Sequence, residues 1–192
     1  IAADELGVNP EAVQVLHGDT AMLPSGQGTF ASRGMTLGGS AMYEGLQHVR
    51  RKMALLAAHL LDCRPDDMVF QEGKIFNQGR PEQALTFAEV AAAAQRREQL
   101  PPDMEVGLEF PGHFILRDNP FGFGAHVAVV EVDRDTGAVK VLRYVAVHDC
   151  GRVINPKLLE GQVYGAIAQG LGQALGEGMQ YSPDGQPLTG TL

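Results

Sequence analysis

The sequence predicts an α+β fold of two small lobes, each built from a mixed or antiparallel sheet with packed helices. Three observations predict this fold: helical spacing of apolar residues in two separate segments, a hairpin signal in the second half, and a Pro-Pro pair between the halves. Residues 98–104 are the expected linker, which gives one lobe at residues 1–100 and another at 101–192. We expect the first lobe to be incomplete at its N-terminus and the second at its C-terminus, because both ends interrupt a helix or strand pattern.

The composition is typical of a globular protein, since 44% of the 192 residues are hydrophobic and 20% are charged. A net charge of −8 argues against nucleic-acid binding, which needs a basic face. The basic cluster at residues 50–52 is expected on a solvated helix face. No apolar run is long enough to span a membrane. Cys63 and Cys150 match neither a disulfide framework nor a CxxC metal site, which fits a reducing, cytoplasmic setting.

The first lobe is expected to open with the end of a helix at residues 1–6, capped by Gly7, and a short strand at 13–17. Residues 18–40 form a loop rich in Gly, Ser and Thr that is longer than a simple connection needs. A helix is expected from about Thr36 or Ser40 to Leu61. Its apolar residues recur at a spacing of three to four: Leu46, Val49, Met53, Leu56 and Leu60.

A hairpin and a short helix complete this lobe. Residues 68–70 and 74–76 are expected to be strands that turn at Gly73. Thr86, followed three residues later by Glu89, forms a capping box and predicts the start of an alanine-rich helix.

The second lobe is expected to begin with three strands, at residues 105–116, 125–132 and 138–148. Asp and Gly in the segment 133–137 supply the geometry of a hairpin turn between the last two. Apolar residues on both faces of these strands indicate a covered sheet.

Residues 156–177 are expected to form a glycine-rich helix, with Asn155 as N-cap and Pro156 at the first helical position. One face is apolar and predicts a core contact: Leu159, Val163, Ile167, Leu171 and Leu175. A second face is small: Gly161, Gly165, Ala168, Gly172 and Gly176. Two interpretations of the small face stay open. It provides tight helix–helix packing, or the helix start faces a polar or anionic ligand with the amides of Gln162 and Gln169.

The loop at residues 25–34 is the other candidate ligand site. Small residues let the backbone approach a ligand, and N–H groups that lead into a helix form an anion site. Thr29 and Ser32 add hydroxyl groups, and Arg33 adds a cation that can bind a phosphate through two hydrogen bonds. An ordinary surface loop is the alternative. The glycines match neither a P-loop nor GxGxxG, so a nucleotide-binding α/β domain is not favoured.

The histidines show no metal-ligand spacing, and we expect all six to be structural. His148 and Cys150 lie near Asp149, but neighbours in a strand point to opposite faces, so no nucleophilic site is expected there.

Seven segments, taken together and in order, resemble the molybdopterin-binding large subunit of the xanthine dehydrogenase/aldehyde oxidase family, with greatest likeness to the aerobic carbon-monoxide-dehydrogenase-like large subunits. They are GDT at 18–20, GTFASR at 28–33, GGS at 38–40, FGAHVAVVEVD at 123–133, GRVINP at 151–156, EGQ at 160–162 and QGLG at 169–172. The resemblance covers essentially the whole chain.

The resemblance implies part of a molybdenum-cofactor-binding domain from a molybdenum hydroxylase. Such an enzyme oxidises an aldehyde, an N-heterocycle or carbon monoxide with oxygen derived from water. The implied cofactor is a molybdopterin that holds molybdenum, expected in the cytosine dinucleotide form, and the implied partners are an iron–sulfur subunit and an FAD subunit. The cofactor-binding residues that it implies are Thr29, Ala31, Ser32, Arg33, Gly161 and Gln162.

The family's catalytic glutamate and its Gly-Gln-Gly cofactor loop are expected outside residues 1–192, so no catalytic residue and no metal ligand is assigned. The isolated chain is therefore expected to be inactive, whether or not it holds cofactor. A non-enzymatic binding or assembly module that keeps the fold is the alternative function. Unpaired strand edges also predict self-association into a homodimer.

Overall fold

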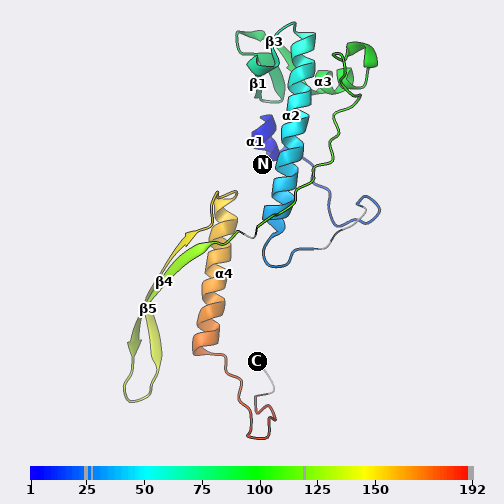
Figure 1. The fold of residues 1–192 in the computed structure, drawn as a ribbon. Helices are drawn as coiled ribbons and strands as arrows, with labels where there is room; N and C mark the ends of the chain where they lie inside the picture. The colour runs from blue at the N-terminus through cyan, green and yellow to red at the C-terminus, as the bar shows by residue number, and fades with distance from the viewer. Residues whose placement is uncertain (24–25, 27, 119, 190–192) are drawn as a thin grey trace. The chain divides into compact units, whose positions relative to one another are not determined.

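The computed structural model describes residues 1–23, 26, 28–118 and 120–189, and it divides into two compact units (Figure 1). The first unit is Ile1–Asp118 and the second is Asn119–Leu192, and each is described here by itself. Residues 101–118 thus belong to the first unit. The assignment of one cofactor-binding lobe to residues 1–100 and another to 101–192 stays a prediction.

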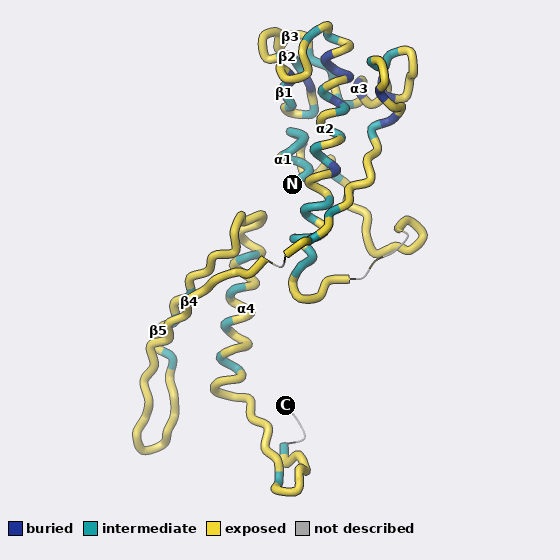
Figure 2. Tube along the Cα trace, viewed as in Figure 1, coloured by how far each residue is buried: buried dark blue, intermediate teal, exposed yellow. Residues whose placement is uncertain are grey.

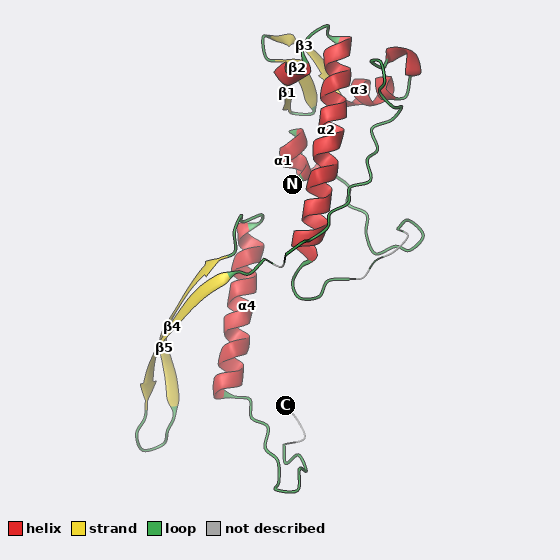
Figure 3. Cartoon of the chain, in the orientation of Figure 1, coloured by secondary structure: helices red, strands yellow, loops and turns green. Residues whose placement is uncertain are grey.

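The first unit combines three α-helices with a three-stranded antiparallel sheet of order β1-β2-β3 (Figure 3). Its helices are α1 (Ala2–Leu6), α2 (Ser40–Leu60) and α3 (Phe87–Ala94), and its strands are β1 (Met68–Gln71), β2 (Lys74–Asn77) and β3 (Arg80–Thr86). Short 3₁₀ turns lie at Pro10–Ala12, Pro65–Asp67 and Arg97–Gln99, and a π-helical turn, Met35–Gly39, leads into α2.

Local signals predicted several of these elements correctly. Gly7 caps α1 in the left-handed conformation with φ 64°. The Thr86 hydroxyl accepts a hydrogen bond from the Glu89 N–H, and the Glu89 carboxylate accepts one from the Thr86 N–H, so the capping box is confirmed. The β1–β2 hairpin turns at Gly73 as predicted, with Gln71 opposite Lys74.

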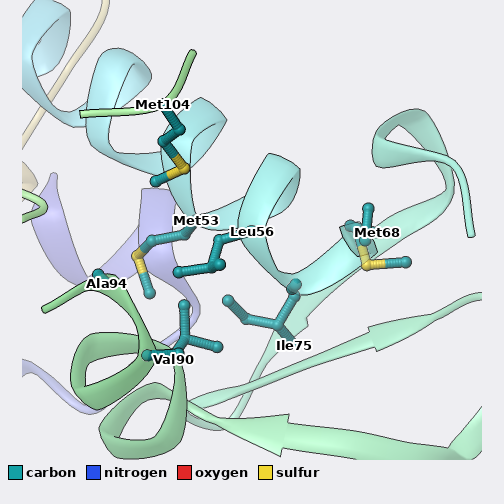
Figure 4. Close-up of a cluster of buried hydrophobic side chains, with 10 residues drawn as sticks. Met53, Leu56, Met68, Ile75, Val90, Ala94 and Met104 are labelled. Atoms are coloured by element: carbon teal, nitrogen blue, oxygen red, sulfur yellow. The ribbon is translucent and has the colours of Figure 1, made fainter. Parts of the chain in front are cut away.

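The core of the first unit lies where α2 meets α3 and the sheet (Figure 4). Met53 and Leu56 project from α2 toward Ile75 of β2 and Val90 of α3, and Leu56, Ile75 and Val90 are fully buried. Met104 closes the cluster from the segment after α3. The predicted apolar stripe of α2 is therefore confirmed in its middle, whereas Leu60 at its end is exposed.

Two expected strands are absent from the described part of the first unit. Residues 13–17 are extended and mostly exposed, but no neighbouring strand pairs with them. Residues 105–116 contain Pro111 and two glycines and form no ladder, because proline lacks the N–H that a ladder needs. This segment instead packs on helices: the Gly107 N–H donates to the Ala94 carbonyl oxygen at 2.8 Å, and the Phe110 ring stacks on His48.

The second unit contains the hairpin β4 (Phe123–Val132) and β5 (Val139–Asp149), followed by helix α4 (Pro156–Leu175). The turn between the strands is the predicted one, because Asp133 Oδ1 accepts hydrogen bonds from the N–H groups of Asp135 and Thr136. Asn155 caps α4 by accepting from the Leu158 N–H at 3.1 Å, as its position predicts.

The second unit has no buried core among its described residues (Figure 2). Every residue of β4 is exposed, so the expectation of a covered sheet is not met within this unit. The apolar stripe of α4 is only half-buried at Leu159, Val163, Ile167 and Leu171, and Leu175 is exposed. A two-stranded sheet and one helix bury too little apolar surface to close a core.

Candidate functional site

The loop before α2 carries the first group of candidate residues. Ala31 and Ser32 both adopt positive φ, at 53° and 52°, a conformation that costs free energy for residues with a Cβ. Both residues are exposed, and they are the two central residues of a turn in which the Arg33 N–H donates to the Phe30 carbonyl oxygen. The π-helical turn Met35–Gly39 follows shortly after. The loop residues Ser25 and Gln27 lie outside the described residues.

The Arg33 side chain packs on a neighbouring aromatic ring, and its positive charge is available to bind an anion. Its guanidinium lies over the Phe30 ring, 4.6 Å from the centroid. The side chain is half-buried, and no carboxylate pairs with it among the ion pairs of the described residues. An anion that approached this loop would meet this cation on the same loop as the hydroxyl groups of Thr29 and Ser32.

Gly34 lets this loop stay tight. A Cβ at that position would stand 2.8 Å from Thr29 Oγ1 and 3.2 Å from its methyl carbon, so the Thr29 side chain occupies the space that a larger residue would need. The Thr29 side chain therefore lies against the Gly34 backbone at the base of the loop.

The second group of candidates, Gly161 and Gln162, lies one turn into α4 on an exposed part of the helix. The first turn offers few free donors, because Pro156 has no N–H and the Leu158 N–H is bound by Asn155. The expected anion site at the helix start is therefore reduced to the N–H of Lys157. Beyond this turn, an approaching ligand would meet the Gln162 amide and open backbone at Gly161.

The N-terminal part of the small face of α4 is open within its own unit. A Cβ built at Gly161 or Gly165 would meet no described atom within 4 Å, whereas one at Gly172 would stand 3.0 Å from Glu177 Oε1. The interpretation as tight helix packing has no partner inside this unit, whereas close approach of a ligand or of another polypeptide segment fits the open space.

A groove of about 440 Å³ lies between β5 and the first half of α4. It is mainly apolar, and its polar members are His148, Glu160 and Tyr164; the other lining residues are Ala146, Val153, Pro156, Leu159 and Val163. The Tyr164 hydroxyl donates to Glu160 Oε1 at 2.8 Å, and this hydrogen bond raises the pKa of Tyr164 above its ordinary value. Glu160 thus keeps a fixed orientation next to Gly161.

Sequence spacing missed one cluster. The β4–β5 pairing brings His126 beside His148, with ring centroids 4.8 Å apart, although 21 residues separate them in the chain. Only the strand register reveals this pair. No group of three or more His, Cys, Asp and Glu in the described part of the chain has metal-binding geometry, and none of the described helices combines the length and apolarity that crossing a membrane requires.

The structure therefore joins the candidates into two separate groups. Thr29, Ala31, Ser32 and Arg33 share one loop of the first unit, and Gly161 and Gln162 share one turn of α4 in the second. A common surface formed by both groups stays a prediction.

Comparison with known proteins gives consistent results. A family profile described as a molybdopterin cofactor-binding domain matches residues 1–192. The large chain of carbon monoxide dehydrogenase from Hydrogenophaga pseudoflava is 34% identical over all of this chain and 24% of its own length. Subunit gamma of the 6-hydroxypseudooxynicotine dehydrogenase complex from Paenarthrobacter nicotinovorans is 34% identical over 98% of this chain and 24% of its own.

A solved structure supports the same fold. Quinoline 2-oxidoreductase from Pseudomonas putida 86 superposes with a TM-score of 0.85 and 37% identity over 99% of this chain and 24% of that chain. The mixed α+β fold with small antiparallel sheets is thus confirmed. The chain spans about a quarter of the length of the relatives it matches.

Proposed function

The chain belongs to the family of molybdopterin cofactor-binding domains, and from that premise we propose that it is part of the cofactor-binding subunit of a molybdenum hydroxylase. The parent enzyme would oxidise an aldehyde, an N-heterocycle or carbon monoxide with oxygen derived from water. Sequence identity of 34% and 37% to a carbon monoxide dehydrogenase large chain and a quinoline oxidoreductase is the observation that carries this proposal.

The loop of the first unit fits the phosphate or pterin part of such a cofactor. The fit rests on the guanidinium of Arg33, which has no ion-pair partner among the described residues, on the hydroxyl groups of Thr29 and Ser32, and on the exposed backbone at Ala31. These groups match a polar, anionic ligand, because charge-assisted hydrogen bonds from a guanidinium to phosphate are short and strong. Their role is to bind and orient the cofactor.

Gly161 and Gln162 would meet the same cofactor from α4. The open space at Gly161 allows a ligand to approach the helix backbone, and the Gln162 amide can both donate and accept hydrogen bonds. When bound, the molybdenum cofactor would supply the oxygen-transfer chemistry. No described residue is assigned a catalytic role.

The finer features of the parent protein belong to the same proposal. We expect the cofactor to be the cytosine dinucleotide form, and we expect iron–sulfur and FAD subunits to accept the electrons. The names of the relatives, a large chain and a subunit of a dehydrogenase complex, support a multisubunit assembly. Association of two chains along the unpaired edges of β4 and β5 is a further expectation.

The function is tested on the purified complex that contains this chain. The complex is offered carbon monoxide, an aldehyde and an N-heterocycle with an artificial electron acceptor in water enriched in heavy oxygen. The proposal expects one of these substrates to be oxidised and its product to carry the heavy isotope from water. Product oxygen that comes from O₂, or a molybdenum-loaded complex that oxidises none of the three classes, would overturn it.

A further inference from the structure

The β4–β5 hairpin places two imidazoles on one face of the sheet. His126 pairs with Ala146 and His148 pairs with Gly124, so the two histidines are diagonal neighbours across the strands. Their ring centroids are 4.8 Å apart with an interplanar angle of 88°. Both side chains are exposed.

Tyr144 holds the first of these rings. Its hydroxyl lies 3.0 Å from His126 Nδ1, and the two rings meet edge to face at 5.7 Å. When Nδ1–H donates to the phenol oxygen, the lone pair of Nε2 is free. A hydrogen bond at one ring nitrogen fixes the tautomer and the orientation of an imidazole, and this is how metal-binding histidines are oriented.

Gly124 makes room for the second ring. A Cβ at that position would stand 3.1 Å from His148 Nδ1, so the His148 imidazole lies across the glycine of the neighbouring strand. The ring can still turn about χ2, because that torsion has a broad energy minimum.

We propose that His126 and His148 together bind one divalent transition-metal ion of the zinc type, with water in the remaining positions. Neutral imidazole nitrogen is a preferred ligand of Zn²⁺, Ni²⁺ and Cu²⁺. Two ligands from an exposed hairpin leave coordination positions open to solvent. The two histidines are not among the residues proposed to bind molybdopterin, and the metal proposal does not depend on that function.

The surroundings favour a cation. Glu160 lines the same groove as His148, and its carboxylate is held by the Tyr164 hydroxyl. The residues that line this groove include no lysine and no arginine. A bound cation would therefore meet a nearby negative charge and no opposing positive charge among these lining residues.

Calorimetric titration of the chain with Zn²⁺ tests the proposal. The titrated background protein carries Cys150→Ser, which removes an exposed thiol directly after β5 that could itself bind zinc. The proposal expects one ion per chain in the background protein. His126→Asn and His148→Asn should each weaken binding by about tenfold or more, and Tyr144→Phe by about tenfold, the usual effect of losing a group that orients a ligand. His59→Asn, an exposed histidine of α2, is the matched control and should leave the titration unchanged.

Histidine NMR signals give a readout that does not depend on the folding of a variant. The imidazole signals of His126 and His148 should shift together on addition of Zn²⁺, while that of His59 stays in place. Absence of binding by the background protein, equal binding by the His148→Asn variant, or shifts at histidines outside the pair would each overturn the proposal.

Discussion

Arg50 Nη1 donates a hydrogen bond to the backbone carbonyl oxygen of Glu5 at 2.6 Å, and this contact ties the end of α1 to the middle of α2. The same guanidinium lies 3.8 Å from the Glu5 carboxylate and 4.7 Å from the centroid of the Phe70 ring. One side chain thus joins α1, α2 and β1. The expectation that residues 50–52 form a solvated face holds only in part for Arg50, whose side chain is 38% exposed but also donates to a carbonyl group at the end of α1.

Replacing this residue should loosen the N-terminal helix. Arg50→Met keeps the apolar stem but removes the donor, and we expect the first unit to lose about 1.5–3 kcal/mol of unfolding free energy, the range for hydrogen bonds to charged groups. Urea denaturation measures the change. Arg51→Met, at the exposed neighbouring position, is the control. Equal stability of the two variants would show that the contact contributes nothing.

The extended segment after α3 crosses α2 at a pair of glycines. Gly45 is buried, and a Cβ on it would stand 3.5 Å from the Gly112 Cα. A Cβ on Gly112 would collide with the carbonyl oxygen of Ala41. We expect Gly112→Ala to lower the unfolding free energy by about 1–3 kcal/mol, as overpacking does. Gly38→Ala, at a position with open space, should not, and thermal unfolding compares the two.

Gly161 separates helix stability from cofactor binding. Gly161→Ala should stabilise α4 by about 0.8–1 kcal/mol, because alanine is the better helix former and no neighbour within 4 Å opposes its methyl group. The same change should weaken cofactor binding if a ligand approaches the helix there. Gly170→Ala should raise the stability of α4 by a similar amount without weakening cofactor binding, since its position is equally open but lies more than two turns from Gly161. Equal cofactor content of the two variants would contradict the role given to Gly161.

Asp133 should make the hairpin sensitive to acid. The Thr136 N–H, the Thr136 side chain and the Asp135 N–H hold the pKa of the Asp133 carboxyl below its ordinary value. A carboxyl with a lowered folded pKa stabilises the fold fully above its unfolded pKa of about 3.9, and this stabilisation is lost as the pH falls through the folded pKa. The protection factors of the amides in β4 and β5, that is, their exchange rates relative to an unfolded chain at the same pH, should therefore fall in acid. Asp133→Asn should reduce that fall, whereas Asp135→Asn should not.

The sequence predicted the elements whose signals are local. Asn155 and Thr86 mark helix starts because capping depends on residues within one turn, and the turn at Asp133 depends on four neighbours. The strand at 105–116 was predicted wrongly because Pro111 interrupts the segment, which contacts α2 and α3 at single points without a ladder. Strand β3 was not predicted, because Pro81 and its polar neighbours do not show the alternation of apolar and polar residues that indicates a strand.

The candidate site depended on resemblance to a greater extent than the fold did. Arg33 and Ser32 stand out by residue type, but nothing local to Gly161 or Gln162 distinguishes a ligand contact from helix packing. The His126–His148 pair arises from strand register alone, and a search for short spacings cannot find it. The apolar residues of β4 and β5 predicted a covered sheet, but sequence periodicity does not tell which segment would cover it.

The molybdenum content of the purified complex that contains this chain, produced in cells that make the cofactor, tests the central claim most directly. Elemental mass spectrometry compares wild type with Arg33→Ala and Gln162→Ala, and with the controls Arg51→Ala and Gln173→Ala on exposed positions of the same two units. The account predicts equal amounts of molybdenum and chain in wild type and controls, and marked loss in the two site variants. A wild-type complex without molybdenum, or site variants that hold as much as wild type, would contradict it.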